Sequence, residues 1–238
     1  MGFFDIIRRK RRSLPESGVL EGLSDRHSHI LPGVDDGVRT LEEALQILSY
    51  YETLGIREVW CTPHVMEDVP NSTASLKSRF EALQKAYHGP VILHLAAEYM
   101  LDPEFESRLE NGDLLTQMND IVLVETSYDI PPYNLTDMLE RMMANGYRPM
   151  MAHPERNNYM QMPDYRRLHD MGVHLQLNLG SLSGYYGENV RKKSFVLLKE
   201  GLYNAAGSDC HSLRSIRHQF ENASLSSDDM ENLKKIAL

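Results

Sequence analysis

Cysteine is scarce in this chain of 238 residues, which contains only Cys61 and Cys210 and no Cys-x-x-Cys pair. Two isolated cysteines exclude a disulfide scaffold and a thiolate zinc site, so we expect a protein of the reducing cytoplasm. A cysteine-dependent phosphatase needs an arginine six residues after its cysteine. The residues at those positions are Glu67 and Ile216, which excludes that chemistry.

The sequence also lacks an apolar run of the roughly 18 residues that span a bilayer, and it contains no Gly-x-Ser-x-Gly or P-loop motif. Its net charge is -9, and without the basic run at 8–12 the remaining 20 basic and 34 acidic residues give -14. Nucleic-acid binding depends on basic side chains that displace counterions, so we expect no nucleic-acid partner.

Residues 1–18 form a basic N-terminal extension, and residues 19–238 show no linker or repeat that would divide them, which predicts one domain. Apolar residues precede the basic run within 3–12. This order favours either peripheral contact with an anionic membrane surface, at the inner face of the membrane, or a solvated tail. The lipidation template fails because position 6 is Ile.

Strand-like and helix-like segments alternate along the domain, about seven times. Thr40 begins one helix with a capping-box pattern to Glu43, and Gly55 ends it. Strands are predicted at 19–25, 57–62, 91–97, 120–126, 148–152, 173–179 and 202–207, with helices at 40–55, 72–88, 102–112, 135–145, 164–171 and 188–200. This order is typical of an α/β fold with a parallel sheet, either an open sheet or a closed barrel.

Six of the seven predicted strands are followed directly by histidine or a carboxylate, where barrel enzymes collect their chemistry. The residues are Asp25, His27, His29, His64, Glu98, Glu125, His153, Asp209 and His211. Imidazole and carboxylate are ligands for manganese, iron or zinc, so the pattern predicts a metal cluster. Taken alone, each residue is explained as well by a hydrogen-bonded or solvated side chain that binds no metal. The prediction therefore depends on their joint placement at the ends of the strands.

His27 and His29 alternate on an extended segment, so both imidazoles project to one side and can bind one ion. One of Asp35 and Asp36, in the loop that follows, can reach the same cluster. Metal ions at this place activate water and screen an anionic substrate, which predicts hydrolysis. Arg156 follows His153 closely enough to hold a phosphate oxygen, although a surface ion pair explains its position equally well.

In this order, the motifs DRHSHILPGVDDG, TPH, AAEYMLD, LVETSY, AHPERN, NLGSLSGYYG and GSDCH resemble a known family. It is the bacterial PHP-domain (polymerase and histidinol phosphatase) metal-dependent protein-tyrosine phosphatases of capsular and exopolysaccharide biosynthesis operons. The resemblance covers residues 25–211 and implies a distorted seven-stranded (β/α)7 PHP barrel. Arg26 departs from the small or aliphatic residue that the family usually has there, and strand alternation turns it away from the ligands.

The resemblance also implies three divalent metal ions, usually manganese, with all nine ligands present. His27, His29 and Asp209 would bind one ion, and Glu98 would bridge it to a second ion. Glu125 and His153 would hold that second ion, and Asp36, His64 and His211 the third. Asp25 would orient a ligand histidine. Arg156 would contact phosphate, with Arg214 or Arg217 as its companion.

The reaction implied by the resemblance is hydrolysis of phosphotyrosine on the Tyr-rich tail of a membrane-bound tyrosine autokinase. A metal-activated hydroxide would attack in line, without a phospho-enzyme. Two alternatives stay open, namely a small-molecule phosphoesterase of the histidinol-phosphatase type and a non-catalytic, metal-stabilised binding module. A homo-oligomer also stays open, because the sequence does not determine the oligomeric state.

Overall fold

The computed structural model describes residues 11–237, which contain nine short strands, all paired in parallel. One sheet has the order β1-β2-β4 and the other has the order β3-β5-β6-β7-β8-β9. The strands are β1 (Ser24–Ser28), β2 (Glu58–Cys61), β3 (His64–Val65), β4 (Ile92–Leu95), β5 (Glu98–Met100), β6 (Ile121–Glu125), β7 (Arg148–Ala152), β8 (His174–Asn178) and β9 (Ala205–Gly207).

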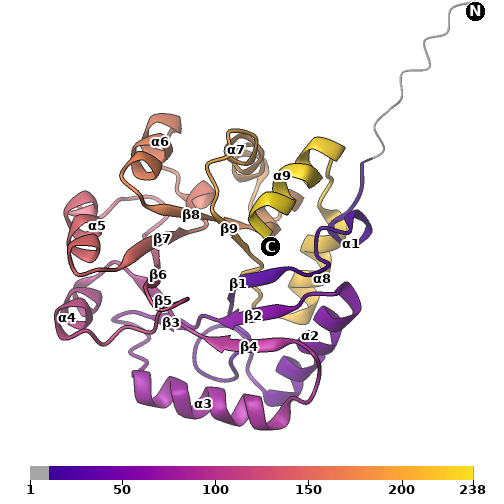
Figure 1. Ribbon diagram of the computed structural model, residues 1–238, viewed down its shortest axis with the longest axis horizontal. Coiled ribbons are helices and arrows are strands. Elements are labelled where there is room, and N and C mark those ends of the chain that lie inside the picture. Colours follow the sequence, from indigo (N-terminus) through magenta and orange to yellow (C-terminus); the bar gives the residue numbers. More distant parts are fainter. Residues whose placement is uncertain (1–10, 238) are drawn as a thin grey trace, which may run out of the picture.

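The strands curl into a parallel half-barrel arrangement around a common centre (Figure 1). Backbone hydrogen bonds join β1 to the segment after β9, from Asp209 N to His27 O at 2.8 Å and from His29 N to Cys210 O at 3.0 Å. The expected α/β class is confirmed, whereas the count of seven strands is not. Pro63, which has no N–H to donate, lies between β2 and β3, so the one strand predicted at 57–62 is followed by a second short strand that was not expected.

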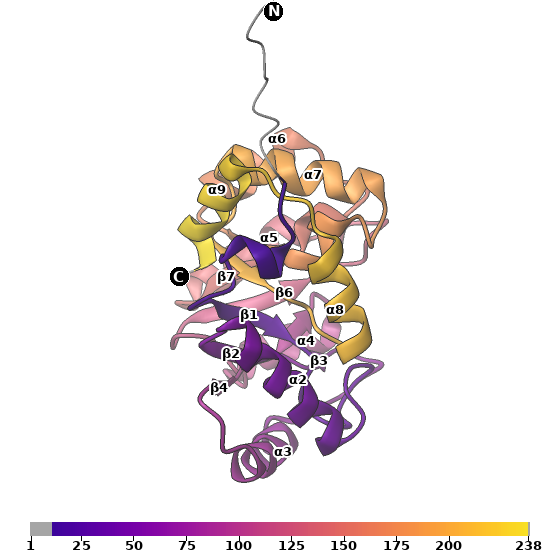
Figure 2. The same cartoon turned by 90° about the vertical axis from the view of Figure 1, so that its right-hand side faces the viewer.

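Helices surround the curled sheets on the outside (Figures 1 and 2). They are α1 (Leu14–Ser17), α2 (Leu41–Leu54), α3 (Thr73–Ala86), α4 (Pro103–Asn111), α5 (Leu135–Ala144), α6 (Met162–Asp170), α7 (Glu188–Lys199), α8 (Leu213–Asn222) and α9 (Ser227–Ala237), with 3-10 turns η1 (Pro154–Arg156) and η2 (Leu179–Ser183). Strand and helix therefore alternate as predicted, except that β3 follows β2 and β5 follows β4 without a helix between them. Three helices of the described chain, α1, α8 and α9, are additional to the six predicted ones.

Strand alternation separates two apolar layers. In β6, Val122 and Val124 belong to the large core beneath the helices, whereas Ile121 and Leu123 belong to a small inner cluster. Opposite faces of one strand therefore face different surroundings, as the two-residue period requires. The inner cluster fills part of the space enclosed by the strands.

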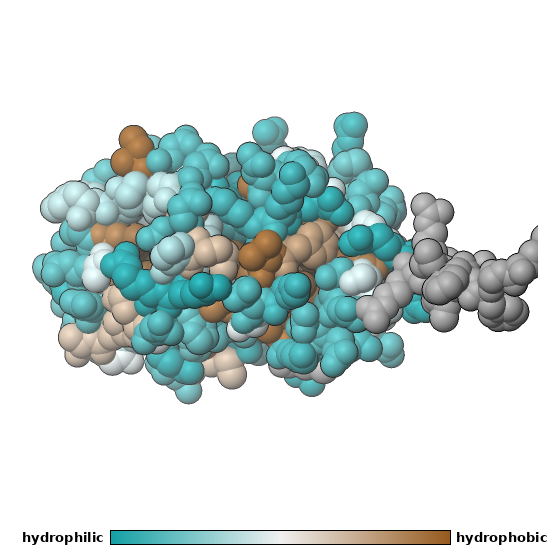
Figure 3. All heavy atoms as spheres, turned by 90° about the horizontal axis from the view of Figure 1, so that it is seen from above, coloured by the Kyte–Doolittle hydropathy of each residue, from teal (hydrophilic) through white to brown (hydrophobic). Residues whose placement is uncertain are grey.

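The described part of the basic extension packs on the domain. Leu14 is fully buried in the core, and Arg12 pairs in antiparallel fashion with Leu225. The boundary between residues 18 and 19 stays a prediction, and of the proposed membrane segment 3–12 all but the last two residues lie outside the described residues. Within residues 11–237, every helix is too short or too polar to cross a bilayer. The face shown in Figure 3 is largely hydrophilic, with small apolar patches.

Helix α2 has the caps that its sequence predicts. The Thr40 hydroxyl accepts a hydrogen bond from Glu43 N at 3.2 Å, and the Glu43 carboxylate accepts one from Thr40 N at 3.2 Å. Gly55 ends the helix with φ of 73°, a conformation that costs glycine little. Between these caps, Tyr51 points inward and is fully buried, so α2 holds a side chain that reaches β1 and β9.

Replacement Thr40→Ala removes this cap, and we expect it to lower the free energy of unfolding by about 1 kcal/mol in urea denaturation. The matched control is Thr53→Ala, which removes an exposed threonine near the end of the same helix. An equal loss in the control variant would show that the cap is not what stabilises the start of α2.

Candidate metal centre

The nine predicted ligands lie together, mostly at or just after the carboxyl ends of strands, with His64 and Glu98 as the first residues of β3 and β5. Six of them are buried, His64 and His211 are partly exposed, and the Asp36 side chain is 72% exposed. They come from β1 and the loop after it, from β3, β5 and β6, and from the segments after β7 and β9. The side chains that follow the predicted strands are therefore close together in the structure, and their role as metal ligands stays a prediction.

The most deeply buried part contains two imidazoles and two carboxylates. The Nε2 atoms of His27 and His29 are 3.0 Å apart, as expected for alternate residues of a strand. Glu98 Oε2 lies 3.2 Å from the first and 3.3 Å from the second. Asp209 Oδ1 lies 3.5 Å and 3.3 Å from the same two nitrogens, so four ligand atoms surround one point.

Glu98 joins this group to its neighbours. Its Oε2 lies 3.1 Å from His64 Nδ1, and its Oε1 lies 2.9 Å from His153 Nε2. Glu125 Oε1 lies 3.0 Å from the same His64 nitrogen, and its Oε2 lies 3.9 Å from His153. A single carboxylate therefore faces four imidazoles, which is the geometry of a bridging ligand.

The outer part of the cluster is built around Asp36. Its Oδ1 lies 3.6 Å from His64 Nε2 and 3.4 Å from His211 Nε2. The His211 ring stacks on His29, with 4.1 Å between ring centroids. Because His29 also belongs to the buried group, its imidazole ring contacts both the inner and the outer part of the cluster.

The candidate ligands form three sets, and within each set the ligand atoms lie within 4.8 Å of one another. These sets differ in part from the grouping that the resemblance implies. The sets are His29, Asp36, His64 and His211; His27, His29 and Glu98; and His64, Glu98 and Glu125. The expected trio around Asp36 gains His29, and His64 belongs to two sets. The individual assignment of each ligand to an ion stays a prediction.

The cluster fits divalent cations. Within the described residues, the buried oxygens Glu98 Oε2 and Glu125 Oε1 make no well-aligned hydrogen bond, although imidazole nitrogens lie 3.0–3.3 Å from them. Buried carboxylates are costly unless positive charge faces them, and either protonated imidazoles or bound cations supply it. Nitrogen and oxygen donors without thiolate suit manganese, iron or zinc.

Opposite charges control the ionisation of the cluster. Burial alone would lower the pKa of His64, but Glu98 and Glu125 outweigh it and raise this pKa to about 9. Burial alone would raise the pKa of Glu98, but the imidazoles of His27 and His64 hold it well below its usual range. A hydrogen bond with His211 lowers the pKa of Asp36 to about 2. In the absence of metal, protons therefore replace cations as the balancing charge.

Two residues orient the buried imidazoles, and this role was not predicted for either of them. Asp35 Oδ2 lies 2.8 Å from His29 Nδ1, and Gln176 Oε1 lies 3.2 Å from His27 Nδ1. Such partners leave Nε2 free for metal. The available signals were the first aspartate of the Asp35-Asp36 pair and a glutamine placed between two leucines of β8.

The orienting role expected of Asp25 stays a prediction, and its carboxylate contacts the backbone of His27, not the imidazole ring. Its carboxylate accepts hydrogen bonds from Ser208 N at 2.7 Å, from the Tyr51 hydroxyl at 2.9 Å and from His27 N at 3.3 Å. It therefore contacts the backbone of His27 and holds β1 against the segment after β9. The His27 ring is already fixed from its other side by Gln176.

The arginines are divided between two places. Arg156 Nη1 lies 2.9 Å from Asp209 Oδ2, beside the cluster. Arg214 and Arg217 line a separate hollow of 1030 Å³ along α8, and the Arg217 guanidinium lies 4.8 Å from the centroid of Tyr50. The structure gives neither of them a hydrogen bond or ion pair with the cluster in residues 11–237, so a companion role toward phosphate stays a prediction.

Arg26 lies away from the ligands, as alternation predicts. Its guanidinium stacks over Trp60, 5.8 Å from the ring centroid, and Glu58 is the acid that faces it. Burial lowers the Arg26 pKa, and the charge of Glu58 partly offsets this effect. The departure from the family pattern is therefore accommodated by neighbours on β2, without any change in the metal ligands.

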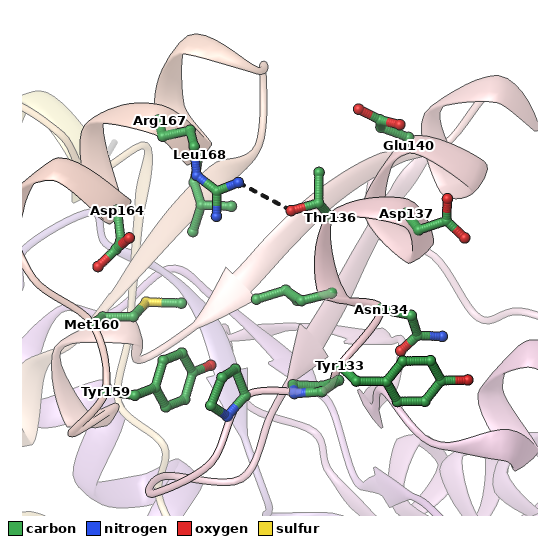
Figure 4. Close-up of a pocket in the computed structure, with 13 residues that line it drawn as sticks. Tyr133, Asn134, Thr136, Asp137, Glu140, Tyr159, Met160, Asp164, Arg167 and Leu168 are labelled. Carbon is green, nitrogen blue, oxygen red and sulfur yellow. Dashed lines mark hydrogen bonds between the residues drawn. The ribbon is translucent and has the colours of Figure 1, made fainter.

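A second hollow, of 560 Å³, lies between the segment that leads into α5 and helix α6 (Figure 4). Arg167 crosses it to donate a hydrogen bond to the Thr136 hydroxyl at 3.1 Å. Its lining includes the fully exposed Tyr133 but none of the nine cluster residues. This hollow is therefore separate from the candidate metal centre.

Replacement Asp35→Asn removes the negative charge beside the His29 ring but keeps the shape of the side chain. We expect metal affinity to fall about 10- to 100-fold, because the imidazole becomes a weaker ligand. The measurement is metal content after dialysis against graded chelator concentrations. Asp170→Asn, at the exposed end of α6, is the control. Equal retention of metal by the two variants would contradict an orienting role.

The metal-free protein should lose stability as pH rises from about 6.5 toward 9. Unfolding returns the His64 pKa from about 9 to the ordinary 6.5, so protonated His64 stabilises the fold below 6.5, and this contribution disappears through 9. We expect a decrease on the order of 2 kcal/mol in urea denaturation with a chelator present. His64→Gln should flatten the profile, and an unchanged slope in that variant would assign the effect elsewhere.

Known proteins resemble this chain in both sequence and fold. A family model described as capsular polysaccharide synthesis, CpsB/CapC, matches residues 23–226. The tyrosine-protein phosphatase YwqE of Bacillus subtilis is 29% identical over 199 residues, which cover 80% of this chain and 78% of YwqE. The tyrosine-protein phosphatase CpsB of Streptococcus pneumoniae is 26% identical over 204 residues, or 80% of this chain and 84% of CpsB.

A solved structure matches with a TM-score of 0.77 at 26% identity and covers 84% of both chains. It comes from crystal structures of YwqE and of CpsB, which are described as unique metal-dependent tyrosine phosphatases. The match agrees with the α/β architecture and with the cluster of metal-binding side chains. This chain therefore belongs to the CpsB/CapC family of capsular polysaccharide synthesis.

Proposed function

We propose that this protein is a metal-dependent protein-tyrosine phosphatase that hydrolyses phosphotyrosine. The observation that carries the proposal is the cluster of imidazoles and carboxylates centred on Glu98. Two relatives that match about four fifths of the chain, YwqE and CpsB, are tyrosine-protein phosphatases. The absence of Cys-x5-Arg from the sequence agrees with a mechanism that does not use a thiol.

The proposed cofactor is a set of three divalent ions, with manganese favoured and iron or zinc as alternatives. His27, His29 and Glu98, with Asp209 beside them, would hold the most buried ion. Glu125 and His153 would join Glu98 at the second, and Asp36, His64 and His211 would hold the third. The buried carboxylates of Glu98 and Glu125 support this assignment, since each needs a positive charge nearby and the surrounding imidazoles are metal ligands when neutral.

The bound ions would supply hydroxide near neutral pH and neutralise phosphate charge. The residues of the chain would then have separate tasks. Arg156 would hold a phosphate oxygen, and Asp209 would hold Arg156 in place through the 2.9 Å ion pair. Asp35 and Gln176 would fix the imidazole rings. The leaving phenolate has a solution pKa of about 10, so it departs with little help from an acid.

The proposed substrate is the phosphorylated, Tyr-rich tail of a membrane-bound bacterial tyrosine kinase, acted on in the cytoplasm. Membership of a capsular polysaccharide synthesis family supports this choice, because the resemblance implies such a kinase in the same operons. The basic residues before position 11 would bring the enzyme to an anionic membrane surface. Arg11 continues this basic run into the domain, where it pairs with Asp229 at 3.7 Å.

The test is turnover of a phosphotyrosine peptide and of histidinol phosphate by the full chain loaded with manganese. We expect the peptide to have the higher kcat/KM and chelation to abolish the activity. Arg156→Ala should lower kcat/KM about 100-fold or more, as loss of a charge-stabilising donor does. Arg166→Ala, which removes an exposed arginine paired with Glu200, is the matched control.

Three outcomes would contradict the proposal. Preference for histidinol phosphate would indicate the small-molecule phosphoesterase. A protein that keeps its metals but hydrolyses neither substrate would indicate the non-catalytic binding module. Unchanged turnover in a His153→Ala, Glu125→Ala double variant would show that the cluster is not the site of the reaction.

A further inference from the structure

A small hollow of 240 Å³ opens beside the metal cluster, and we call it the ring pocket. Its lining residues are Tyr128, Arg156, Asn158, Tyr186 and Val190. None of the five is a predicted metal ligand, but two of them contact the cluster. Arg156 pairs with Asp209, and the Tyr128 ring lies edge-on to His153 with 5.8 Å between centroids. A molecule in the ring pocket would therefore lie next to a group bound at the cluster.

The Arg156 guanidinium is held between two aromatic rings. It lies 4.4 Å from the centroid of Tyr128 and 4.2 Å from that of Tyr186, which places both rings within cation–π distance. The Asn178 amide donates to Asp209 Oδ2 at 2.8 Å and to the Tyr186 hydroxyl at 3.3 Å. One amide thus fixes both the carboxylate that pairs with Arg156 and a ring that covers it.

This arrangement limits what Arg156 can bind. The two rings cover its faces, and Nη1 is used by Asp209. Within residues 11–237, the structure gives no hydrogen bond donated by its Nη2 or Nε. The planar edge of a guanidinium suits the oxygens of phosphate. The free edge of Arg156 therefore fits the phosphate end of a substrate, and the remaining pocket is left for the group that the phosphate is attached to.

The size and lining of the pocket indicate what that group is. A cavity of about 150 Å³ accommodates benzene, so 240 Å³ holds one phenyl ring with its linking oxygen. Two aromatic rings and the Val190 side chain supply apolar walls, and aromatic pairs gain energy beyond the area that they bury. A simple alkyl group would leave much of this space to water.

We propose that the ring pocket binds the aromatic ring of an aryl phosphate, and that Tyr128, Tyr186 and Val190 determine specificity for aryl over alkyl phosphates. This inference rests on the proposed function, because it requires phosphate to bind at the metal cluster. It adds to that function the residues that recognise the group which leaves with the ester oxygen.

The test compares two phosphonates that cannot be hydrolysed, phenylphosphonate and methylphosphonate, by isothermal titration calorimetry of the full chain loaded with manganese. We expect phenylphosphonate to bind at least about 10-fold more tightly, as expected for a ring that fills an apolar pocket. Val190→Trp fills the pocket from the start of α7 and should remove this preference. Tyr128→Leu should reduce it and serves as the second variant if Val190→Trp does not fold.

The matched control is Tyr133→Leu, at a fully exposed tyrosine outside the ring pocket, which should keep the preference of the unchanged chain. Equal affinity for the two phosphonates, or a preference that survives both pocket variants, would overturn the ring pocket while leaving the phosphatase proposal intact. If neither phosphonate binds the loaded protein, the proposed phosphate site fails, and the ring pocket fails with it.

Discussion

The structure depends on the burial of like charges at one place. Glu98, Glu125 and Asp209 are almost fully buried close together, and the burial of several carboxylates in one place is costly without a compensating positive charge. The imidazoles around Glu98 supply that charge when protonated, and cations supply it when bound. The strands that carry these residues are therefore coupled through their ends, and removal of one partner affects all of them.

Asp209 connects the cluster to the residues that we propose contact substrate. One of its oxygens faces His27 and His29, and the other binds both Arg156 and Asn178. Its φ is 53°, a conformation uncommon outside glycine. Strained residues persist only where their surroundings hold them, and they concentrate at functional sites. The left-handed backbone at Asp209 therefore costs some free energy of folding, and it places one carboxylate between the histidines of the cluster and Arg156.

Local patterns predicted the local structure well. The strand expected at 148–152 is observed over Arg148–Ala152, and the helix that Thr40 begins ends before Gly55. The first strand is displaced, since it was expected at 19–25 and is observed over Ser24–Ser28. Polar and charged residues at its centre lack the apolar signal of a strand, because the metal cluster, Arg26 and the contact with β9 give them partners that the local sequence does not contain.

The sequence by itself determined the order of elements and the chemical type of the cluster, because both follow from spacing along the chain. Only the tertiary structure decided that Glu98 faces four imidazoles, that Asp35 and Gln176 orient the rings, and that two tyrosines hold Arg156. Apart from the contact of Asp35 with His29, these contacts join residues of different strands and loops, up to 149 positions apart for His27 and Gln176. Their distances depend on how the sheets curl, which no local pattern specifies.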